Sequence, residues 1–446
     1  MRKIHLLGIL ALALILSNIT TESFAQAKWV RVKKNKVYSP GDRDMAAIPS
    51  GQAFVGIPVD IMDTLAVSGR MVSISAFFMD RTEVSNKQYR EFVNWVRDSV
   101  AVTTLGPTVA PNLFKEVKTT EGGATLSSER QIDWKNVKKY LWSNGKNGYA
   151  DQLSFMFYSG DDALLGKREI DIRKLKYSFS FMNMDLAAAG RKDPTKNRKD
   201  FIQSHIDDPD PSKSNEYPSI SVYPDTLVWK MDYGYSENDP MVRDYFNNPA
   251  YNDFPVVGVT WEQANAYCVW LTRKYDGRKS SKKHPKLQFR LPTAAEFEYA
   301  AKAGRENAKF PWDGDILRGE KGHLLANFKT EAGNYTPDYG LFPVNVRSYA
   351  PNDYELYNMA GNVAEWTTTA YNPSAAALLN DFNPNFTYAS TAADSKYLKR
   401  KVVKGGSWKD ISYFLQNSVS TFEFQDQPRS YIGFRCVASY PGTNIQ

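Results

Sequence analysis

The stretch Leu356–Trp366, LYNMAGNVAEW, combines aromatic anchors, a glycine turn and oxygen-bearing side chains within eleven residues. Gly361 followed by Asn362 indicates a turn, because both residue types tolerate positive φ. Such a bend lets backbone carbonyls converge with the side-chain oxygens of Asn358 and Glu365, as in sites that hold a hard cation such as calcium. Alternatively, the two side chains hydrogen-bond within a tight loop, as buried polar groups usually do. The stretch is therefore predicted to be a cation site or a structural scaffold.

Length and charge narrow the class of protein. The 446 residues include 56 Lys and Arg against 49 Asp and Glu, giving a formal charge of +7. This modest excess does not indicate nucleic-acid binding, because no stretch interleaves aromatic and basic residues in a recognition pattern. It suits an anionic surface or an acidic partner. The recognisable motifs are spread over most of the chain, which favours one large domain with an insertion.

The N-terminus has the pattern of a cleavable export signal. Arg2 and Lys3 precede the apolar run Leu6–Leu16, and small residues near Ala25 suit signal peptidase. The run is too short for a permanent membrane span. We expect residues 1–25 to be a signal peptide and residues 26–47 an extended arm. No cysteine lies near the cleavage point, so no lipid attachment is expected.

Three motifs predict helix starts by the same mechanism. In a capping box, a Ser or Thr and a residue three positions later satisfy the first free amides of a helix. The boxes are Ser85 with Gln88, Thr260 with Gln263, and Thr293 with Glu296. Apolar residues at helical spacing follow each box, and the first helix is expected from about Asn86 to Val96. Short β-like runs are expected at Ile48–Gly56, Phe254–Thr260, Val344–Tyr349, Val402–Lys404 and Ile432–Ser439.

The segment from about residue 100 to residue 237 is interpreted as an insertion. It is rich in polar and turn residues, but aromatic runs such as YLWSNG and FMFYSG make it too apolar to be disordered throughout. We expect it to pack on the domain while exposing loops. Together with the short strands and few helices, this predicts an irregular α+β fold with long loops.

The motif blocks resemble those of the formylglycine-generating enzyme, or sulfatase-modifying factor, family. The resemblance implies that family's irregular, C-type-lectin-like α+β fold for residues 48–446. The blocks that carry it occur in the family's order and are IPSGQAFVG (48–56), FFMDRTEVSNKQYREF (77–92), PVVGVTWEQANAYCVWL (255–271), RLPTAAEFEYAAKAG (290–304), FPWDG (310–314), LYNMAGNVAEW (356–366), KVVKGGSW (401–408) and YIGFRC (431–436).

The chain contains two cysteines, Cys268 and Cys436. An even count in an exported chain predicts a candidate disulfide, and the alternative is a pair of buried free thiols. The family resemblance implies that these two positions are paired.

The resemblance also raises a question about catalysis. The family's oxidase uses two reactive cysteines just after its GGSW block, where this sequence has Asp410 and Leu415. Thiolates hold Cu(I), and neither a carboxylate nor an alkyl chain replaces them. We therefore expect no copper, no catalytic residue and no enzyme activity. The alternative is a formylglycine-generating-type oxidase or another thiol-modifying enzyme that uses replacement residues around Asp410.

The resemblance implies structural calcium sites as well. The family's second site corresponds to the side chains of Asn358 and Glu365 with the carbonyls of Gly361 and Val363. Its first site corresponds to three further residues, Asn327, Phe328 and Asp338.

Within the family, two stretches resemble the noncatalytic GldK/PorK proteins of the type IX secretion and gliding machinery. They are residues 221–268 and residues 348–367. This resemblance implies a periplasmic ring component at the outer membrane, with self-association and a GldN/PorN-like periplasmic protein among its partners. Because no cysteine is available for acylation, we expect membrane association through these partners and other outer-membrane components of the secretion system. A third hypothesis is ligand binding at the surface, as in C-type lectins.

Overall fold

The computed structural model describes the larger part of the chain between Arg43 and Ser439. The expected signal peptide and residues 26–42 of the expected arm lie outside the described residues. The described residues are 43–56, 69–121, 124–145, 147–164, 167–182, 193, 195, 202–204, 219–232, 239–277, 287–330, 342–374, 379–388, 390 and 394–439.

Three helices begin at the predicted capping boxes, and all three boxes are confirmed. In each box the cap hydroxyl accepts the amide of the third helical residue, whose side chain returns to the cap amide. These helices are α2 (Asn86–Val109), α7 (Trp261–Asp276) and α8 (Ala294–Lys302). The shorter α-helices are α3 (Trp134–Tyr140), α5 (Val228–Met231) and α6 (Asp239–Asp244).

Helix α2 is longer than the predicted end at Val96. It continues to Val109, with a non-helical residue at Gly106, which has a φ of 70°, followed by Pro107. Ala101, Val102 and Leu105 are buried, so the apolar stripe continues past the predicted end and supports the extra turns. The expected insertion therefore starts as a continuation of a core helix.

Two four-stranded sheets form the centre of the domain. The first has the order β1-β4-β16-β11, and the second has the order β14-β13-β12-β15. The strands of the first sheet are β1 (Met45–Ile48), β4 (Phe77–Asp80), β16 (Val437–Ser439) and β11 (Phe289–Arg290). Those of the second are β14 (Thr421–Phe424), β13 (Arg400–Lys404), β12 (Ala364–Ala370) and β15 (Ile432–Gly433).

The second sheet joins three of the motif blocks. Strand β12 pairs antiparallel with β13, with Glu365 opposite Lys404, and parallel with β15, with Glu365 opposite Gly433. The stretch that starts β12 thus lies between the two blocks that end the chain, although more than thirty residues separate it from either one in sequence.

The remaining strands form two-stranded ladders. They are β2 (Gly51–Val55) with β3 (Arg70–Ile74), β5 (Phe114–Glu121) with β6 (Ala124–Ile132), β7 (Lys176–Tyr177) with β10 (Ile220–Ser221), and β8 (Ser180–Met182) with β9 (Ile202–Ser204).

Several strand predictions are corrected by the structure. Phe254–Thr260 and Val344–Tyr349 form no strand apart from an isolated bridge at Pro255. Gly258 has a φ of 71°, which interrupts an extended run whose valines are nevertheless buried. Ile432–Ser439 forms two short strands, not one. The last residues of the expected arm, Met45–Ala47, belong to β1 and pair with β4.

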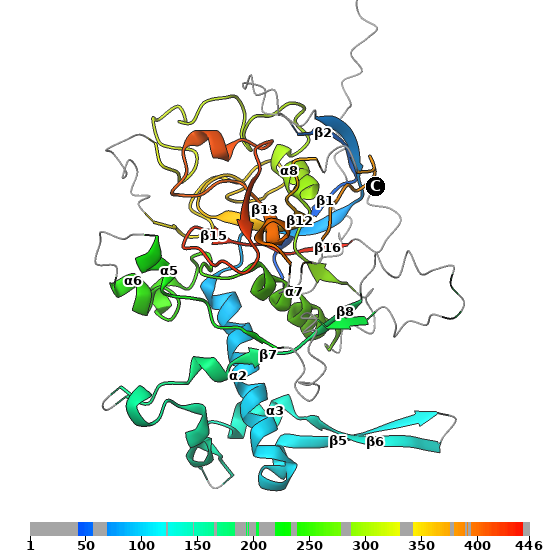
Figure 1. Cartoon of the computed structure of the whole chain (residues 1–446), viewed down its shortest axis with the longest axis vertical. Helices are drawn as coiled ribbons and strands as arrows, with labels where there is room; N and C mark the ends of the chain where they lie inside the picture. Colours follow the sequence, from blue (N-terminus) through cyan, green and yellow to red (C-terminus); the bar gives the residue numbers. More distant parts are fainter. Residues whose placement is uncertain are drawn as a thin grey trace, which may run out of the picture. The chain divides into compact units, whose positions relative to one another are not determined.

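Aromatic residues connect α2 to α7 in the core. Tyr89 and Phe92 of α2 contact Tyr267 of α7, with ring centroids 5.6 and 5.9 Å apart. A second cluster packs α8 against the first sheet through Phe297, Phe77 and their neighbours. Figure 1 shows α2 leading from the region of the sheets towards α3 and the β5–β6 ladder.

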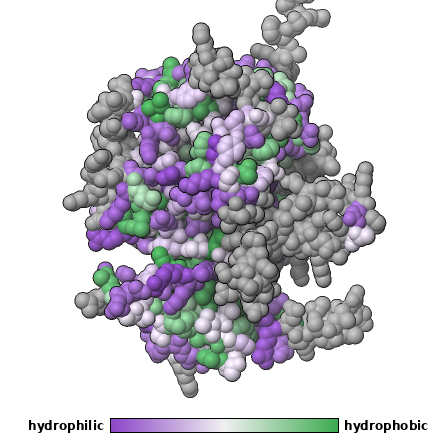
Figure 2. All heavy atoms as spheres, viewed as in Figure 1, coloured by the Kyte–Doolittle hydropathy of each residue, from purple (hydrophilic) through white to green (hydrophobic). Residues whose placement is uncertain are grey.

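The architecture confirms the predicted fold class, an irregular α+β domain with short strands, few helices and long loops. On the face drawn in Figure 2, hydrophilic and hydrophobic residues are mixed, without one broad apolar area. In the part of the chain that the structure describes, no helix is long and apolar enough to cross a membrane.

Candidate functional site

The turn at Gly361 and Asn362 has the predicted backbone conformation. Gly361 has a φ of 77° and Asn362 a φ of 62°, and Asn358 is also left-handed at 49°. An added Cβ at Gly361 would lie 2.5 Å from the carbonyl oxygen of Asn327, so the close approach also requires glycine. The amide of Asn362 donates to that same carbonyl at 2.8 Å. The turn is therefore fixed by tight backbone packing.

Glu365 forms a fully buried ion pair with Arg435. The Nε of Arg435 lies 2.7 Å from Oε2 of Glu365, and its Nη2 lies 2.6 Å from Oε1. Both side chains are 0% exposed. The guanidinium also donates to the carbonyls of Asp80 and Tyr357, so its other donors are used as well. Such a pair tolerates burial because both charges are paired and hydrogen-bonded.

Glu83 is a site residue that the sequence analysis did not identify. Its two carboxylate oxygens accept hydrogen bonds from the side-chain amides of Asn362 and Asn358, at 2.9 and 3.2 Å. Burial raises the pKa of Glu83 to about 8; Arg435 opposes this rise and Glu365 reinforces it. The one local signal was an acid two positions before a capping box, and nothing nearby in sequence marks its distant partners.

The expected calcium ligands are only partly brought together. The Oδ1 atom of Asn358 is buried without a hydrogen-bond partner, which suits a cation ligand. Glu365 does not fit that role in this arrangement, because Arg435 occupies both of its oxygens. Among the described residues, no group of three or more His, Cys, Asp or Glu is placed to hold a metal. The arrangement favours hydrogen bonding within a tight loop, and the calcium ion stays a prediction.

The other expected calcium site is described only in part. Asn327 and Phe328 are buried, and the side-chain amide of Asn327 donates to the carbonyl of Phe342 at 2.8 Å. Asp338 lies outside the described residues.

The loop after Gly405 and Gly406 holds the two positions expected to replace the oxidase cysteines. The hydroxyl of Ser407 donates to Oδ2 of Asp410 at 2.6 Å, and burial raises the pKa of Asp410. Leu415 is fully buried in an apolar cluster with residues such as Phe310. This loop therefore presents a hydroxyl–carboxylate pair and an apolar contact.

The glycines before this loop allow two backbone segments to approach each other. Both have positive φ, and a Cβ on Gly406 would lie 2.7 Å from the carbonyl oxygen of Phe414. Glycine is therefore required here for the close approach of the two backbone segments.

The two cysteines face each other in the core. Cys268 of α7 and Cys436 are buried free thiols in this structure, with their sulfur atoms 3.4 Å apart. The structure brings the expected partners together, and the disulfide itself stays a prediction.

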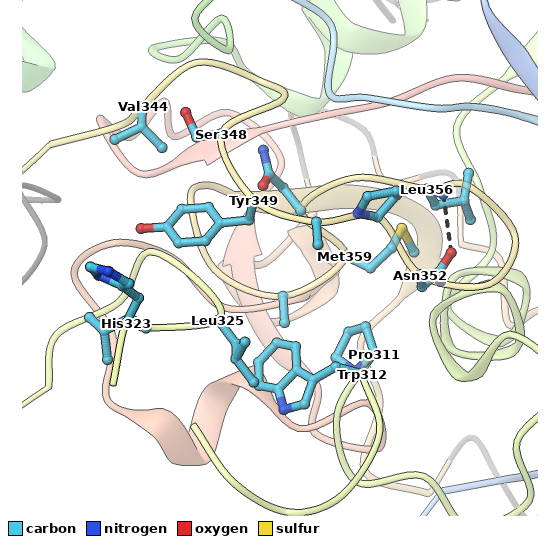
Figure 3. A pocket seen from close by; sticks show the side chains of 15 residues that line it. Pro311, Trp312, His323, Leu325, Val344, Ser348, Tyr349, Asn352, Leu356 and Met359 are labelled. Atoms are coloured by element: carbon cyan, nitrogen blue, oxygen red, sulfur yellow. Dashed lines mark hydrogen bonds between the residues drawn. The ribbon is translucent and has the colours of Figure 1, made fainter. Parts of the chain in front are cut away.

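A hollow of about 510 Å³ lies beside the central turn. Its wall comes from two loops, residues 311–325 and residues 344–360. Figure 3 shows the side chains of Trp312, Tyr349 and His323 around it, and Asn352 accepting a hydrogen bond from the amide of Leu356. It is a mostly apolar hollow with a few polar groups at its edge.

The fold and site define a class of protein: an irregular α+β domain organised around a glycine–asparagine turn and a buried glutamate–arginine pair. Residues 184–440 match the family model of the sulfatase-modifying factor enzyme 1-like domain. The chain belongs to this family.

Its relatives include active and inactive enzymes. The chain is 32% identical over 195 residues to the formylglycine-generating enzyme of Mus musculus, covering 42% of this chain and 45% of that protein. It is 29% identical over 195 residues to the inactive C-alpha-formylglycine-generating enzyme 2 of Mus musculus, covering 42% and 50%. The chain thus spans about half the length of these relatives. PvdO from Pseudomonas aeruginosa aligns in structure with a TM-score of 0.46 and 14% identity, covering 90% of this chain and 97% of PvdO.

Proposed function

We propose that this protein is a non-catalytic structural component of the type IX secretion machinery, with a role in gliding motility where that system drives it. In this proposal it forms a periplasmic, ring-like scaffold at the outer membrane. Its partners are further copies of itself, a GldN/PorN-like periplasmic protein and other outer-membrane components of the system.

The observation that carries the proposal is the chemistry of the loop after Gly406. A copper-dependent oxidase of this family needs two thiolates there, and the loop offers the Ser407–Asp410 hydrogen bond and the buried side chain of Leu415. The two cysteines of the sequence lie elsewhere, on α7 and directly before β16. Relatives named as inactive exist in the same family, so a non-catalytic role has precedent.

The stretch 221–268, which carries part of the GldK/PorK resemblance, is tied together by α7. The side-chain amide of Gln263, a member of the capping box, donates to the carbonyls of Ser221 and Tyr223 at 2.9 and 3.1 Å. Asn86 of α2 similarly donates to the carbonyls of Tyr245 and Tyr251. This stretch is thereby held to α2 and α7, as a rigid scaffold requires.

The test is affinity purification of the tagged protein from gently solubilised envelopes, with partner identification and electron microscopy of the largest species. We expect an annular complex that contains a second exported protein. A monomer without a stable partner would overturn the scaffold proposal.

A parallel assay addresses the oxidase alternative. The purified protein is incubated with copper and a cysteine-containing peptide, and the peptide mass is measured. We expect an unchanged mass, and oxidation of the cysteine would overturn the non-catalytic assignment.

We include a structural calcium ion at Asn358 in the proposal, because its Oδ1 atom has no hydrogen-bond partner. A chelator should then lower the unfolding midpoint of the wild-type protein. In the Asn358→Asp variant, added calcium should raise the unfolding midpoint. Equal midpoints with and without chelator would remove the ion from the proposal.

A further inference from the structure

A groove of about 1240 Å³ lies between α2, α3 and α7, away from the site described above. Helix α2 presents residues at helical spacing along it, from Glu91 through Asn94 and Trp95 to Asp98. Helix α7 contributes Trp270, Arg273 and Lys274 in the same way, and α3 contributes Trp134 and Lys138. Each helix therefore turns a mixed aromatic and polar stripe towards the same space.

Three indole rings lie together in this groove. The rings of Trp95 and Trp134 are stacked, with centroids 5.1 Å apart and an angle of 27° between planes. The ring of Trp270 lies 6.5 Å from that of Trp95. Trp270 is buried, whereas Trp95 and Trp134 are half-buried. Half-buried indoles in a groove offer a flat apolar face beside a polar donor.

The charges around this surface nearly cancel. Three lining residues are acidic (Asp44, Glu91 and Asp98) and four are basic (Arg43, Lys138, Arg273 and Lys274), a difference of one. Some are already paired: Lys274 lies 2.5 Å from Glu91, and Asp98 accepts from Trp142 and Arg97. The groove thus offers both hydrogen-bond donors and acceptors without selecting a strongly charged ligand.

The lining does not suit the usual ways of binding a polypeptide. Leu271 is the one aliphatic side chain among its described lining residues, so a helix would find no row of apolar pockets. These residues come from helices, the turn after α7 and the segment before β1, so no strand edge is offered for an added strand. The volume exceeds the roughly 300–1,000 Å³ of small-molecule pockets, which favours an extended ligand.

We propose that this groove binds an uncharged polysaccharide, a chain of linked pyranose rings whose flat C–H faces pack against the outer surface of the Trp134–Trp95 stack. Hydroxyl groups of the sugar bond to rim side chains such as Asn94, which is exposed. The inference does not depend on the scaffold proposal. A chain of N-acetylhexosamines and a neutral glucan share this chemistry.

The test is titration of the full exported chain, followed by tryptophan fluorescence and calorimetry. One arm uses a tetramer of N-acetylglucosamine, and the other a neutral glucan tetramer. Saturable binding in one arm is expected and identifies the source of the ligand. Saturation in neither arm, or binding of peptides in place of both sugars, would overturn the proposal.

Variants locate the binding. Trp134→Ala should raise the dissociation constant at least tenfold, and Asn94→Ala about threefold. Trp312→Ala is the matched control, because this half-buried indole lies in the other hollow, and it should change binding less than twofold. Circular dichroism checks that each variant is folded. Unchanged affinity in both Trp134→Ala and Asn94→Ala would overturn the assignment to this groove.

Discussion

Glu365 and Arg435 form an ion pair with both side chains fully buried, whereas Glu91 and Lys274 form one at the rim of the groove with side chains 54% and 37% exposed. The buried pair has exchanged water for fixed partners, so its geometry is tied to the fold. The Glu91–Lys274 pair at the rim stays hydrated, so either side chain can leave its partner and bind a group of a ligand. In this protein an ion pair of a glutamate with a basic residue therefore specifies structure in the core, and a similar pair at the groove is available for ligand recognition.

The largest expected effect on stability comes from the two buried cysteines, one of which lies on α7. Cys268 and Cys436 are 168 positions apart, so closing this loop should stabilise the oxidised protein by about 5 kcal/mol on the chain-entropy model. Thermal unfolding with and without reductant measures the difference. Cys268→Ser is the control and should not respond to reductant. Two titratable thiols in denatured protein that was never reduced would contradict the prediction.

Arg435→Met tests the contribution of the buried ion pair with Glu365 to stability. The change leaves the Glu365 carboxylate without its partner in the core, which should cost about 3 to 5 kcal/mol in the free energy of unfolding. Urea denaturation measures it. Arg429→Met is the matched control, because Arg429 pairs with Glu423 while its own side chain is 28% exposed, and its loss should be under about 1 kcal/mol. Similar losses in both variants would show that burial does not distinguish the two pairs.

Glu83→Gln tests the pH dependence of the buried region. The pKa of Glu83 rises from 4.5 to about 8 on folding, so the folded state favours the protonated acid. Its contribution to stability is full below pH 4.5 and is lost as the pH rises through 8. The variant should therefore gain up to about 5 kcal/mol on the wild type between pH 4.5 and pH 9, at about 1.4 kcal/mol for each pH unit between the two pKa values.

Unfolding midpoints across this pH range provide the measurement for Glu83→Gln. Glutamine is neutral and keeps one acceptor oxygen and a donor, so it resembles the protonated form of Glu83. Parallel curves for variant and wild type would show that Glu83 is ionised throughout the range.

Lys274→Gln should have the smallest effect. Loss of an exposed ion pair changes the free energy of unfolding by less than about 0.5 kcal/mol. Chemical denaturation in low salt measures it, since salt screens what little the pair contributes. A loss above 2 kcal/mol would mean that the rim is part of the structural core, and the contrast between the two regions would fail.

Local signals in the sequence predicted local structure well. The three capping boxes and the positive φ at Gly361 and Asn362 depend on residues a few positions apart, and all were correct. The ion pair of Glu365 was not foreseen, because its partner lies 70 positions away, and Glu83 lies 275 positions from Asn358. Such pairings are decided by the packing of the whole domain.

The strand predictions failed for a related reason. A run of buried valines such as Val256, Val257 and Val259 looks like a strand, but one glycine with positive φ turns it into an irregular buried segment. The groove was missed because its tryptophans come from three helices, one of which was predicted to end before Asp98. The apolar stripe of α2 in fact continues to Leu105, but the helix was predicted to end near the expected start of the insertion.

The continuity of α2 has a mechanical consequence. The helix spans 24 residues, so at 1.5 Å per residue it is about 36 Å long, with a break only near its end at Gly106. The turns between Gln88 and Asp98 border the groove on one face, and Tyr89 and Phe92 on the same turns are held among the core aromatics. A pull or twist applied to a ligand in the groove is therefore transmitted across one rigid helix directly into the core, where a flexible linker would have absorbed it.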